Sequence, residues 1–325
     1  MSPQSKTQET RAIRPRQKFE VTGLVTGVIQ LPNGPWTVTV PYDGSLRVWN
    51  SQSGKQIGND WWNRGVANAI ALSPDGTKVL CKTANRELQL WNIDTEKIIW
   101  SRRHAGYIKC VCWNRDGGRV VSGSSDGTAR VWDVESGKIV LEIETRLGRV
   151  KAMICSPDTT MIAIGGYTEN SDEFLNIWDA NTGKFITHLK GHTRDVDCLA
   201  WTADGKTLIS GSIDSLIRTW NTTTLQQINV LTGHSSIVHG IALSPNGRIL
   251  ASVSWDETAR LWDLENSQPI GTPLQHPGNV DCVSFSTDGK LLATGCSGGD
   301  AYSWDIAPIV REAGLDELLL NTNVS

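Results

Sequence analysis

Hydrophobic and polar residues alternate along this chain in short runs that are separated by tight-turn sequences. One unit reads "DVDCLAW" at 195–201, a turn "TADG", a second run "KTLISGS", another turn and "LIRTW" at 216–220. Alternation with a period of two predicts β-strands, and turns such as "SPDG" at 73–76 supply the positive φ that tight hairpins need. No segment with helical periodicity precedes residue 307. The pattern predicts an all-β protein built from units of four short antiparallel strands.

A Trp followed by Asp or Asn closes each unit. The pattern occurs as "LRVWN", "LQLWN", "ARVWD", "LNIWD", "IRTWN", "ARLWD" and "AYSWD", at Trp49, Trp91, Trp132, Trp178, Trp220, Trp262 and Trp304. Successive tryptophans are 42, 41, 46, 42, 42 and 42 residues apart. Seven copies at nearly constant spacing indicate seven equivalent structural units.

These copies, which cover roughly residues 17–306, resemble WD40 repeats. The resemblance implies a seven-bladed β-propeller whose ring is closed by a strand borrowed from the N-terminal end. We expect "RQKFEV" at 16–21 to be the fourth strand of blade seven, because the sequence after Trp304 lacks strand alternation. The chain reads like stand-alone fungal WD40 proteins and also resembles the C-terminal propellers of NACHT-type signalling proteins.

The propeller is expected to span 16–306, between a polar, disordered tail at 1–15 and a C-terminal tail at 307–325. Within the C-terminal tail, apolar spacing predicts a short amphipathic helix from Pro308 to about Leu320. Such a helix either caps the propeller or docks on a partner. Its apolar residues are Ile309, Val310, Leu315, Leu318 and Leu319.

Composition narrows the partners and the compartment. The formal net charge of −3 argues against nucleic acid, which calls for clustered Lys and Arg. No apolar run is long enough for a membrane span, and the first residues lack the apolar core of a secretory signal. The seven cysteines are not spaced like the disulfide framework of a secreted protein, so we interpret them as reduced thiols. We expect a cytoplasmic or nuclear protein without a cofactor, a monomeric propeller within a larger complex.

Three copies carry a His, a Ser, an Asp and a Trp at one spacing. The His-to-Ser distance is 18 residues and the Asp-to-Trp distance is six in each. The pattern occurs three times, and no hydrolase needs three copies of a Ser-His-Asp triad at once, which argues against a catalytic triad. The resemblance implies instead a buried structural network, in which Asp accepts from His, His meets Ser, and Ser reaches the Trp indole. No catalytic or metal-ligating residue is assigned. The three tetrads are His104, Ser122, Asp126 and Trp132; His192, Ser210, Asp214 and Trp220; His234, Ser252, Asp256 and Trp262.

The resemblance also implies where a partner binds. In WD40 proteins the narrow top face around the channel mouth commonly receives peptides. Three positions in each copy map to this face: three and five residues after the His position, and the residue before the turn Asp. They place cations beside a more acidic and aromatic arc, as specific peptide sites tend to show. The candidates are Tyr42, Tyr107, Lys109, Arg149, Lys151, Asp195, Asp197, Ile237, His239, Trp255 and Asp281.

Among these candidates Trp255 is the sharpest, because copies two, three and seven have the small residues Ala84, Ser125 and Ser297 there. The alternative is a chance surface aromatic. His239 either makes binding pH-sensitive or is a polar rim residue. The lengthened copy places "GGYTENSDEF" at 165–174, either as a length variant or as an acidic loop that masks Arg149 and Lys151.

Three functional classes remain open. The first is a non-enzymatic scaffold or adaptor that binds a peptide or protein domain on the top face. The second is a sensor or regulatory module that works with a NACHT-type signalling ATPase on a separate chain, because this sequence has no P-loop motif. The third is a propeller enzyme or small-ligand binder, which calls for converging carboxylates or metal ligands. We favour the scaffold.

Overall fold

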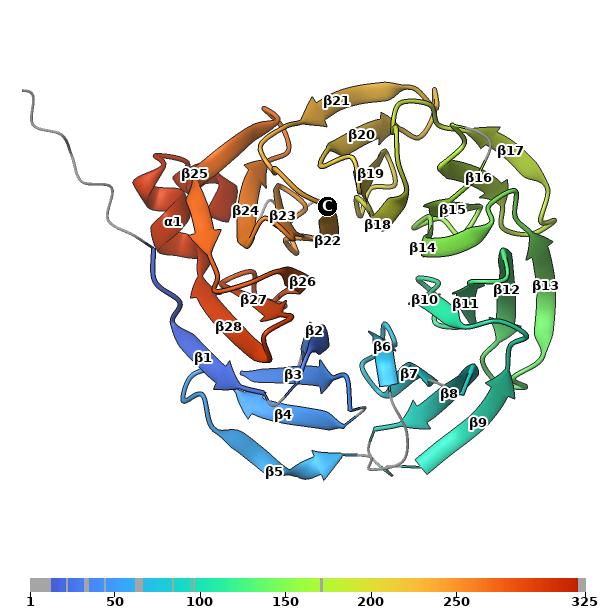
Figure 1. Ribbon diagram of the computed structural model, residues 1–325, viewed down its shortest axis with the longest axis horizontal. Helices are drawn as coiled ribbons and strands as arrows, with labels where there is room; N and C mark the ends of the chain where they lie inside the picture. The colour runs from blue at the N-terminus through green and yellow to red at the C-terminus, as the bar shows by residue number, and fades with distance from the viewer. Residues whose placement is uncertain are drawn as a thin grey trace, which may run out of the picture.

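The computed structural model describes residues 13–21, 23–31, 35–43, 45–61, 67–83, 85–93, 95, 97–169 and 172–320. Across these residues the strands form seven four-stranded antiparallel sheets, which radiate as blades from a central opening (Figure 1). Consecutive strands run from the inside of each blade to its outside. The predicted seven-bladed, all-β propeller is confirmed.

Blades one to four follow one another along the chain. From the opening outward, blade one contains β2 (Val25–Gln30), β3 (Trp36–Pro41), β4 (Leu46–Asn50) and β5 (Gln56–Trp61); blade two contains β6 (Ala67–Leu72), β7 (Lys78–Thr83), β8 (Glu87–Asn92) and β9 (Lys97–Arg103); blade three contains β10 (Ile108–Trp113), β11 (Arg119–Ser124), β12 (Thr128–Asp133) and β13 (Ile139–Glu144); blade four contains β14 (Arg149–Cys155), β15 (Met161–Tyr167), β16 (Leu175–Asp179) and β17 (Phe185–His188).

The last blade joins the two ends of the propeller. Blade five contains β18 (Val196–Trp201), β19 (Thr207–Ser212), β20 (Ile217–Asn221) and β21 (Gln227–Leu231); blade six contains β22 (Val238–Leu243), β23 (Ile249–Ser254), β24 (Thr258–Asp263) and β25 (Gln268–Gln275); blade seven contains β26 (Val280–Phe285), β27 (Leu291–Cys296), β28 (Asp300–Asp305) and β1 (Gln17–Glu20). Strand β1 pairs antiparallel with β28, with Phe19 opposite Ala301. The N-terminal strand therefore closes the ring, as the sequence predicts.

The hydrophobic core lies between neighbouring blades. One cluster joins blade five to blade six through Ile209, Val238 and Trp262, all buried. Close approach of the blades requires glycine at one position on the second strand. A Cβ built on Gly211 would come within 2.7 Å of Val238 on the next inner strand. The same position is glycine in blades three, four and seven.

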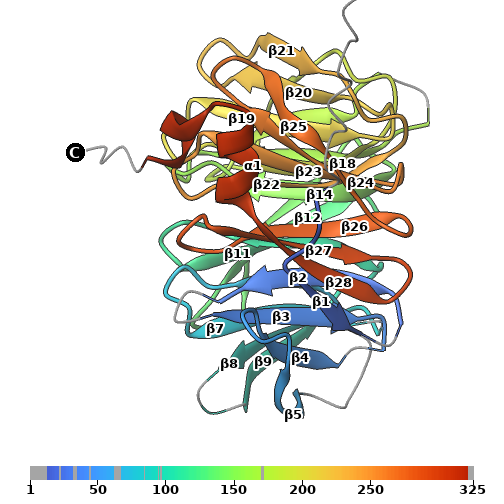
Figure 2. The ribbon, with the colours of Figure 1, turned by 90° about the vertical axis from the view of Figure 1, so that its left-hand side faces the viewer.

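The C-terminal segment differs in part from the predicted single helix. Helix α1 (Ile306–Glu312) begins two residues before Pro308, which the first turn tolerates because its N–H groups have no partner within the helix. A left-handed residue, Gly314 with φ +73°, ends this segment, and the 3-10 helix η1 (Asp316–Leu319) follows. Figure 2 shows α1 beside β25 on one side of the ring. The buried side chains of the segment are Ile306, Ile309, Val310 and Leu318.

This segment packs on blades six and seven as a cap. Its buried residues share one apolar cluster with Ile270 and Trp304. Ile13 also packs against the cluster, so the expected N-terminal tail is in contact with the propeller at its last residues. The rest of the expected tail, residues 1–12, lies outside the described residues, so its expected disorder stays a prediction.

Candidate functional site

A β-bulge sits at the same position of every inner strand. The pairing register between the first and second strands shifts by one residue in all seven blades, five residues after the tetrad His position. A bulge leaves one residue outside the ladder and re-aims its side chain. The repeat therefore places one such residue per blade around one end of the opening, which we call the mouth together with the turns beside it. The bulge residues are Thr26, Asn68, Lys109, Lys151, Asp197, His239 and Asp281.

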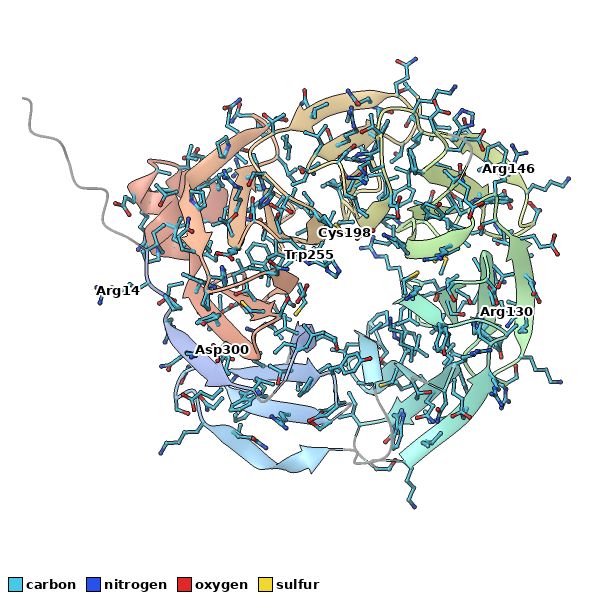
Figure 3. The ribbon with its side chains drawn as sticks, viewed as in Figure 1. Arg14, Arg130, Arg146, Cys198, Trp255 and Asp300 are labelled. Atoms are coloured by element: carbon cyan, nitrogen blue, oxygen red, sulfur yellow. The ribbon has the colours of Figure 1, made fainter. Side chains whose placement is uncertain are left out.

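Blades six and seven hold an aromatic residue at the mouth. Trp255, in the turn after β23, leaves 41% of its surface exposed. Its ring stacks on His239, with centroids 5.8 Å apart and planes 13° apart, and its indole N–H donates to Asp281 Oδ1 at 2.9 Å. Ser297 Oγ donates to Asp281 Oδ2 at 2.6 Å, and His239 Nδ1 donates to the carbonyl of Asp281 at 2.9 Å. Trp255 is thus fixed by both neighbours while its outer surface stays open, near the inner strands (Figure 3).

Blades four and five contribute an ion-paired triad at the mouth. The ammonium of Lys151 lies 2.9 Å from Asp195 Oδ2 and 2.8 Å from Asp197 Oδ1. Burial opposes the positive charge, but hydrogen bonds to Asp197 and Asp195 outweigh it and raise the pKa of Lys151. Lys151 is therefore held by its own chain and is less available to a partner than the sequence suggests.

The other candidates pair aromatic rings with cations. The exposed ring of Tyr107 lies 4.7 Å from the guanidinium carbon of Arg86, and that of Tyr167 lies 5.7 Å from Arg149. Such cation–π contacts hold each guanidinium group against an aromatic ring. The remaining candidates stand apart from these pairs: Tyr42 is 55% exposed on blade one, Lys109 is exposed on blade three, and Ile237 is half-buried below Trp255.

Sequence reasoning missed Lys82, a buried lysine on β7. Only 9% of its surface is exposed, and its ammonium donates to the carbonyl of Lys109, the bulge residue of the next blade, at 2.7 Å. Burial lowers the pKa of Lys82 to about 8. Comparison of the repeats could have identified this residue, because Lys82 occupies the position that is glycine in blades three, four, five and seven.

The expected tetrads form fully in blades five and six. In blade five, His192 Nδ1 donates to Asp214 at 2.8 Å, His192 Nε2 contacts Ser210 Oγ at 2.8 Å, and Trp220 Nε1 donates to Ser210 Oγ at 2.8 Å. Burial opposes ionisation of Asp214, but the hydrogen bond and charge of His192 together with backbone hydrogen bonds from Thr193 and Leu216 outweigh it and lower the pKa of the carboxyl group. Blade six repeats these contacts at 2.8, 2.7 and 2.8 Å with His234, Asp256, Ser252 and Trp262.

Blade three departs from the expected tetrad. His104 Nε2 contacts Ser122 Oγ, and Trp132 Nε1 donates to Ser122, both at 2.7 Å, but His104 Nδ1 has no hydrogen-bond partner. Asp126 instead accepts from the backbone N–H of Gly106 at 2.8 Å. The predicted Asp126–His104 hydrogen bond is therefore wrong.

The residue before the histidine gives the physical reason. Gly191 and Gly233 precede the histidines of blades five and six, with φ of +154° and +158°, which side chains disfavour. Blade three has Arg103 there, and its turn binds Asp126 one residue later than theirs. With its outer nitrogen unpaired, His104 is buried as a neutral ring, and burial lowers its pKa to about 4.

Two acidic residues of the loop at 165–174 form ion pairs on the outer side of blade four. In this loop, of which residues 170–171 are not described, Asp172 faces Lys190 at 4.0 Å and Glu173 faces His188 at 3.5 Å. Both partners lie at or after the outer strand β17. These two ion pairs lie on the outside of blade four, and the hypothesis that the loop masks Arg149 and Lys151 stays a prediction.

Three further features bear on the wider set of functional classes. No helix in the described part of the chain is long and apolar enough to cross a membrane. Within the same residues, no three His, Cys, Asp or Glu side chains converge as a metal site would need. All seven cysteines are free thiols.

Comparison with known proteins agrees with this geometry. The family model described as "WD domain, G-beta repeat" matches residues 97–133, 183–221, 225–263 and 267–305. These segments end at or within one residue of the Trp-Asp or Trp-Asn pairs of blades three, five, six and seven. The chain contains WD40 repeats and folds as a seven-bladed propeller. Most of blades one, two and four lies outside the match, and the propeller architecture of these blades comes from the structure.

Curated relatives share about half of this WD40 chain. Apoptotic protease-activating factor 1 of Rattus norvegicus is 31% identical over 52% of the chain and 13% of its own length. Autophagy-related protein 16 of Arabidopsis thaliana is 28% identical over 53% of the chain and 34% of its own length. Small ribosomal subunit protein RACK1y of Oryza sativa subsp. japonica is 28% identical over 46% of each. The chain thus matches less than half the length of these relatives.

Proposed function

We propose that this WD40 propeller is a non-enzymatic scaffold that binds a peptide or a folded domain of a protein partner at the mouth. The observation that carries the proposal is Trp255, whose ring stacks on His239 and whose N–H is held by Asp281. A large aromatic surface that is held open and rigid loses little entropy on binding, which is the usual property of an interface hot spot.

The charges around Trp255 support a protein partner. Asp195, Asp197 and Asp281 lie on the side of blades five to seven, and Lys109 and Arg149 lie on the side of blades three and four. Opposite charges on two sides of one mouth give a partner a fixed orientation. Regulation alongside a signalling ATPase stays an alternative prediction, as do a monomeric propeller and a cytosolic or nuclear location, which the free thiols favour.

Affinity capture with wild-type protein and two matched variants tests the proposal. Trp255→Ala removes the exposed aromatic at the mouth, and Ile228→Ala removes an apolar residue of similar exposure, 47%, from the outer strand β21. Partners identified by mass spectrometry are then titrated against each variant by calorimetry, after thermal unfolding has shown that both variants fold.

We expect Trp255→Ala to weaken binding by more than about tenfold and Ile228→Ala to leave it unchanged. Equal affinity for wild type and Trp255→Ala would place the interface elsewhere on the propeller. Loss with Ile228→Ala alone would move it to the outer strands.

A further inference from the structure

Lys82 is a buried cation without a counter-ion. Its ammonium has one hydrogen-bond acceptor, the carbonyl of Lys109, and no carboxylate among the described residues forms an ion pair with it. Burial of a charge is costly unless the charge is paired and hydrogen-bonded. Two of the three ammonium protons remain available for an acceptor that the chain itself does not supply.

A second cation lies beside the first. Lys109 leaves the bulge of β10, is exposed, and forms no ion pair with any described residue. The ammonium of Lys82 reaches the backbone carbonyl of Lys109, so the side chain of Lys82 ends beside the point where the side chain of Lys109 begins. Asp126 of the same blade is occupied by Gly106 and Thr128. Blades two and three therefore hold two cations together without neutralising either.

The side chains around Lys82 add no negative charge. Strand β10 presents Lys109 and Cys110, and burial raises the pKa of Cys110 to about 12, so that its thiol is neutral. Glu87 of β8 is directed to Gln89 and Ser101 instead. Strand β6 has no titratable residue in its sequence "ANAIAL". Among the residues that the structure describes here, the two lysines set the charge at this point.

We propose that Lys82 and Lys109 form an oxyanion-binding subsite at the mouth, which takes a carboxylate or phosphate group of the bound partner. The identity of the occupant as part of a partner rests on the proposed function, whereas anion binding itself does not. A bound oxyanion supplies the missing counter-charge and accepts the free ammonium protons, as charge-assisted hydrogen bonds do. It lies across the mouth from Trp255 and gives the partner a second anchor.

Anion binding at this subsite is coupled to protonation. Because burial lowers the pKa of free Lys82 to about 8, part of the population loses its charge above that pH. An anion stabilises the charged ammonium and raises its pKa, so binding is strongest below pH 8 and is lost as the pH rises. Between pH of about 7 and about 9 the affinity falls about tenfold through Lys82 alone.

Nuclear magnetic resonance of lysine side chains labelled at Cε measures this directly. The signal of Lys82 is titrated with pH in chloride, in sulfate and in acetate. Sulfate represents a phosphate-like dianion and acetate a carboxylate, and neither changes charge in the range used. Assignment uses Lys82→Met, and Lys206→Met, which removes an exposed lysine from a turn of blade five, is the control.

We expect sulfate, acetate or both to raise the pKa of Lys82, and the stronger of the two identifies the class of group. We expect Lys109→Met to weaken the effect and Lys206→Met to leave it intact. If neither anion moves the titration of Lys82, or if all lysines move equally, the subsite does not exist. The titrations that decide this are measured on wild-type protein, and Lys82→Met serves only to assign the signal.

The outcome separates this inference from the proposed function. An anion-dependent shift of Lys82 together with partner binding that ignores Trp255 would overturn the proposed interface and leave the anion subsite. If partner binding needs Trp255 but neither anion shifts the pKa of Lys82, the anion subsite is overturned and the proposed interface stands.

Discussion

Trp255 of blade six donates its indole N–H to Asp281 of blade seven across the boundary between the two blades, at 2.9 Å. The same carboxylate accepts from Ser297, and the same tryptophan stacks on His239. An exposed aromatic is thus oriented by two blades at once. Its orientation depends on the contact between blades six and seven and not on blade six alone.

Removal of the acceptor should weaken binding without unfolding the propeller. In Asp281→Ala the indole loses its partner and the ring gains freedom, so we expect partner affinity to fall about tenfold and stability by about 1 kcal/mol or less. Asp281→Asn, which keeps an oxygen acceptor, should retain most of the affinity. Calorimetry on the partner and urea denaturation give the two quantities. Unchanged affinity in Asp281→Ala would show that orientation of Trp255 contributes nothing.

Two buried histidines should make stability depend on pH. Burial lowers the pKa of His104 and that of His276 to about 4, whereas an unfolded histidine titrates near 6.5. The unfolded chain therefore binds protons first as the pH falls, and stability is lost between pH of about 6.5 and about 4. At pH of about 5 the loss is about 2 kcal/mol for each histidine relative to pH of about 7.

Urea denaturation at both pH values measures the effect. We expect His104→Gln to remove the contribution of His104, so that the stability of this variant changes less with pH than that of the wild type. Trp132→Phe, which deletes a neighbouring hydrogen bond but no titrating group, should lower stability equally at both pH values. The same slope in wild type and His104→Gln would contradict the prediction.

The spacing of the tryptophans was sufficient for the fold. Seven copies of one strand pattern leave few alternatives, and the missing strand of blade seven had to come from "RQKFEV" because the sequence after Trp304 is not strand-like. The end of the C-terminal helix was not predictable from apolar spacing, because Gly314 interrupts it with a left-handed turn. Local backbone chemistry outweighed a regular pattern there.

The candidate site was predictable by position but not by contact. Counting from the histidine found the bulge residues, because a repeat fixes the register of every inner strand. The pairing of Lys151 with Asp195 and Asp197 depends on side-chain reach between blades, which spacing does not contain. The loss of the Asp126 contact came from Arg103 in place of glycine, a residue outside the four that were compared.

Blade four can be stabilised by one substitution that the other blades suggest. Its Trp178 Nε1 is buried without a hydrogen-bond partner, because Ile164 stands where an acceptor belongs. In blades one and seven a threonine at this position accepts from the tryptophan at 2.8 and 3.0 Å. We expect Ile164→Thr to be more stable than Ile164→Val, which loses similar bulk and offers no acceptor, by about 1 kcal/mol. Urea denaturation of the two variants makes the comparison, and Ile164→Val equal to or above Ile164→Thr would contradict it.

Lys82 should make the propeller more stable in mild alkali. The pKa of Lys82 is about 8 in the folded protein and near 10.4 in an unfolded chain, so the unfolded state binds more protons between these values. Stability therefore rises with pH in this window, by about 3 kcal/mol in total from this group. Ionisation of the buried cysteines acts in the opposite direction, because burial raises the pKa of thiols such as Cys81 and Cys110.

The difference between wild type and Lys82→Met isolates the lysine. Methionine fills similar space without charge, so below pH of about 8 we expect Lys82→Met to be the more stable protein, by about 1 kcal/mol or more. The gap should close as the pH rises to about 10, because wild-type Lys82 has then become neutral. Urea denaturation of both proteins across this range measures the gap. A constant gap would mean that Lys82 keeps its charge through the window, and that a counter-ion already pairs with it in the folded chain.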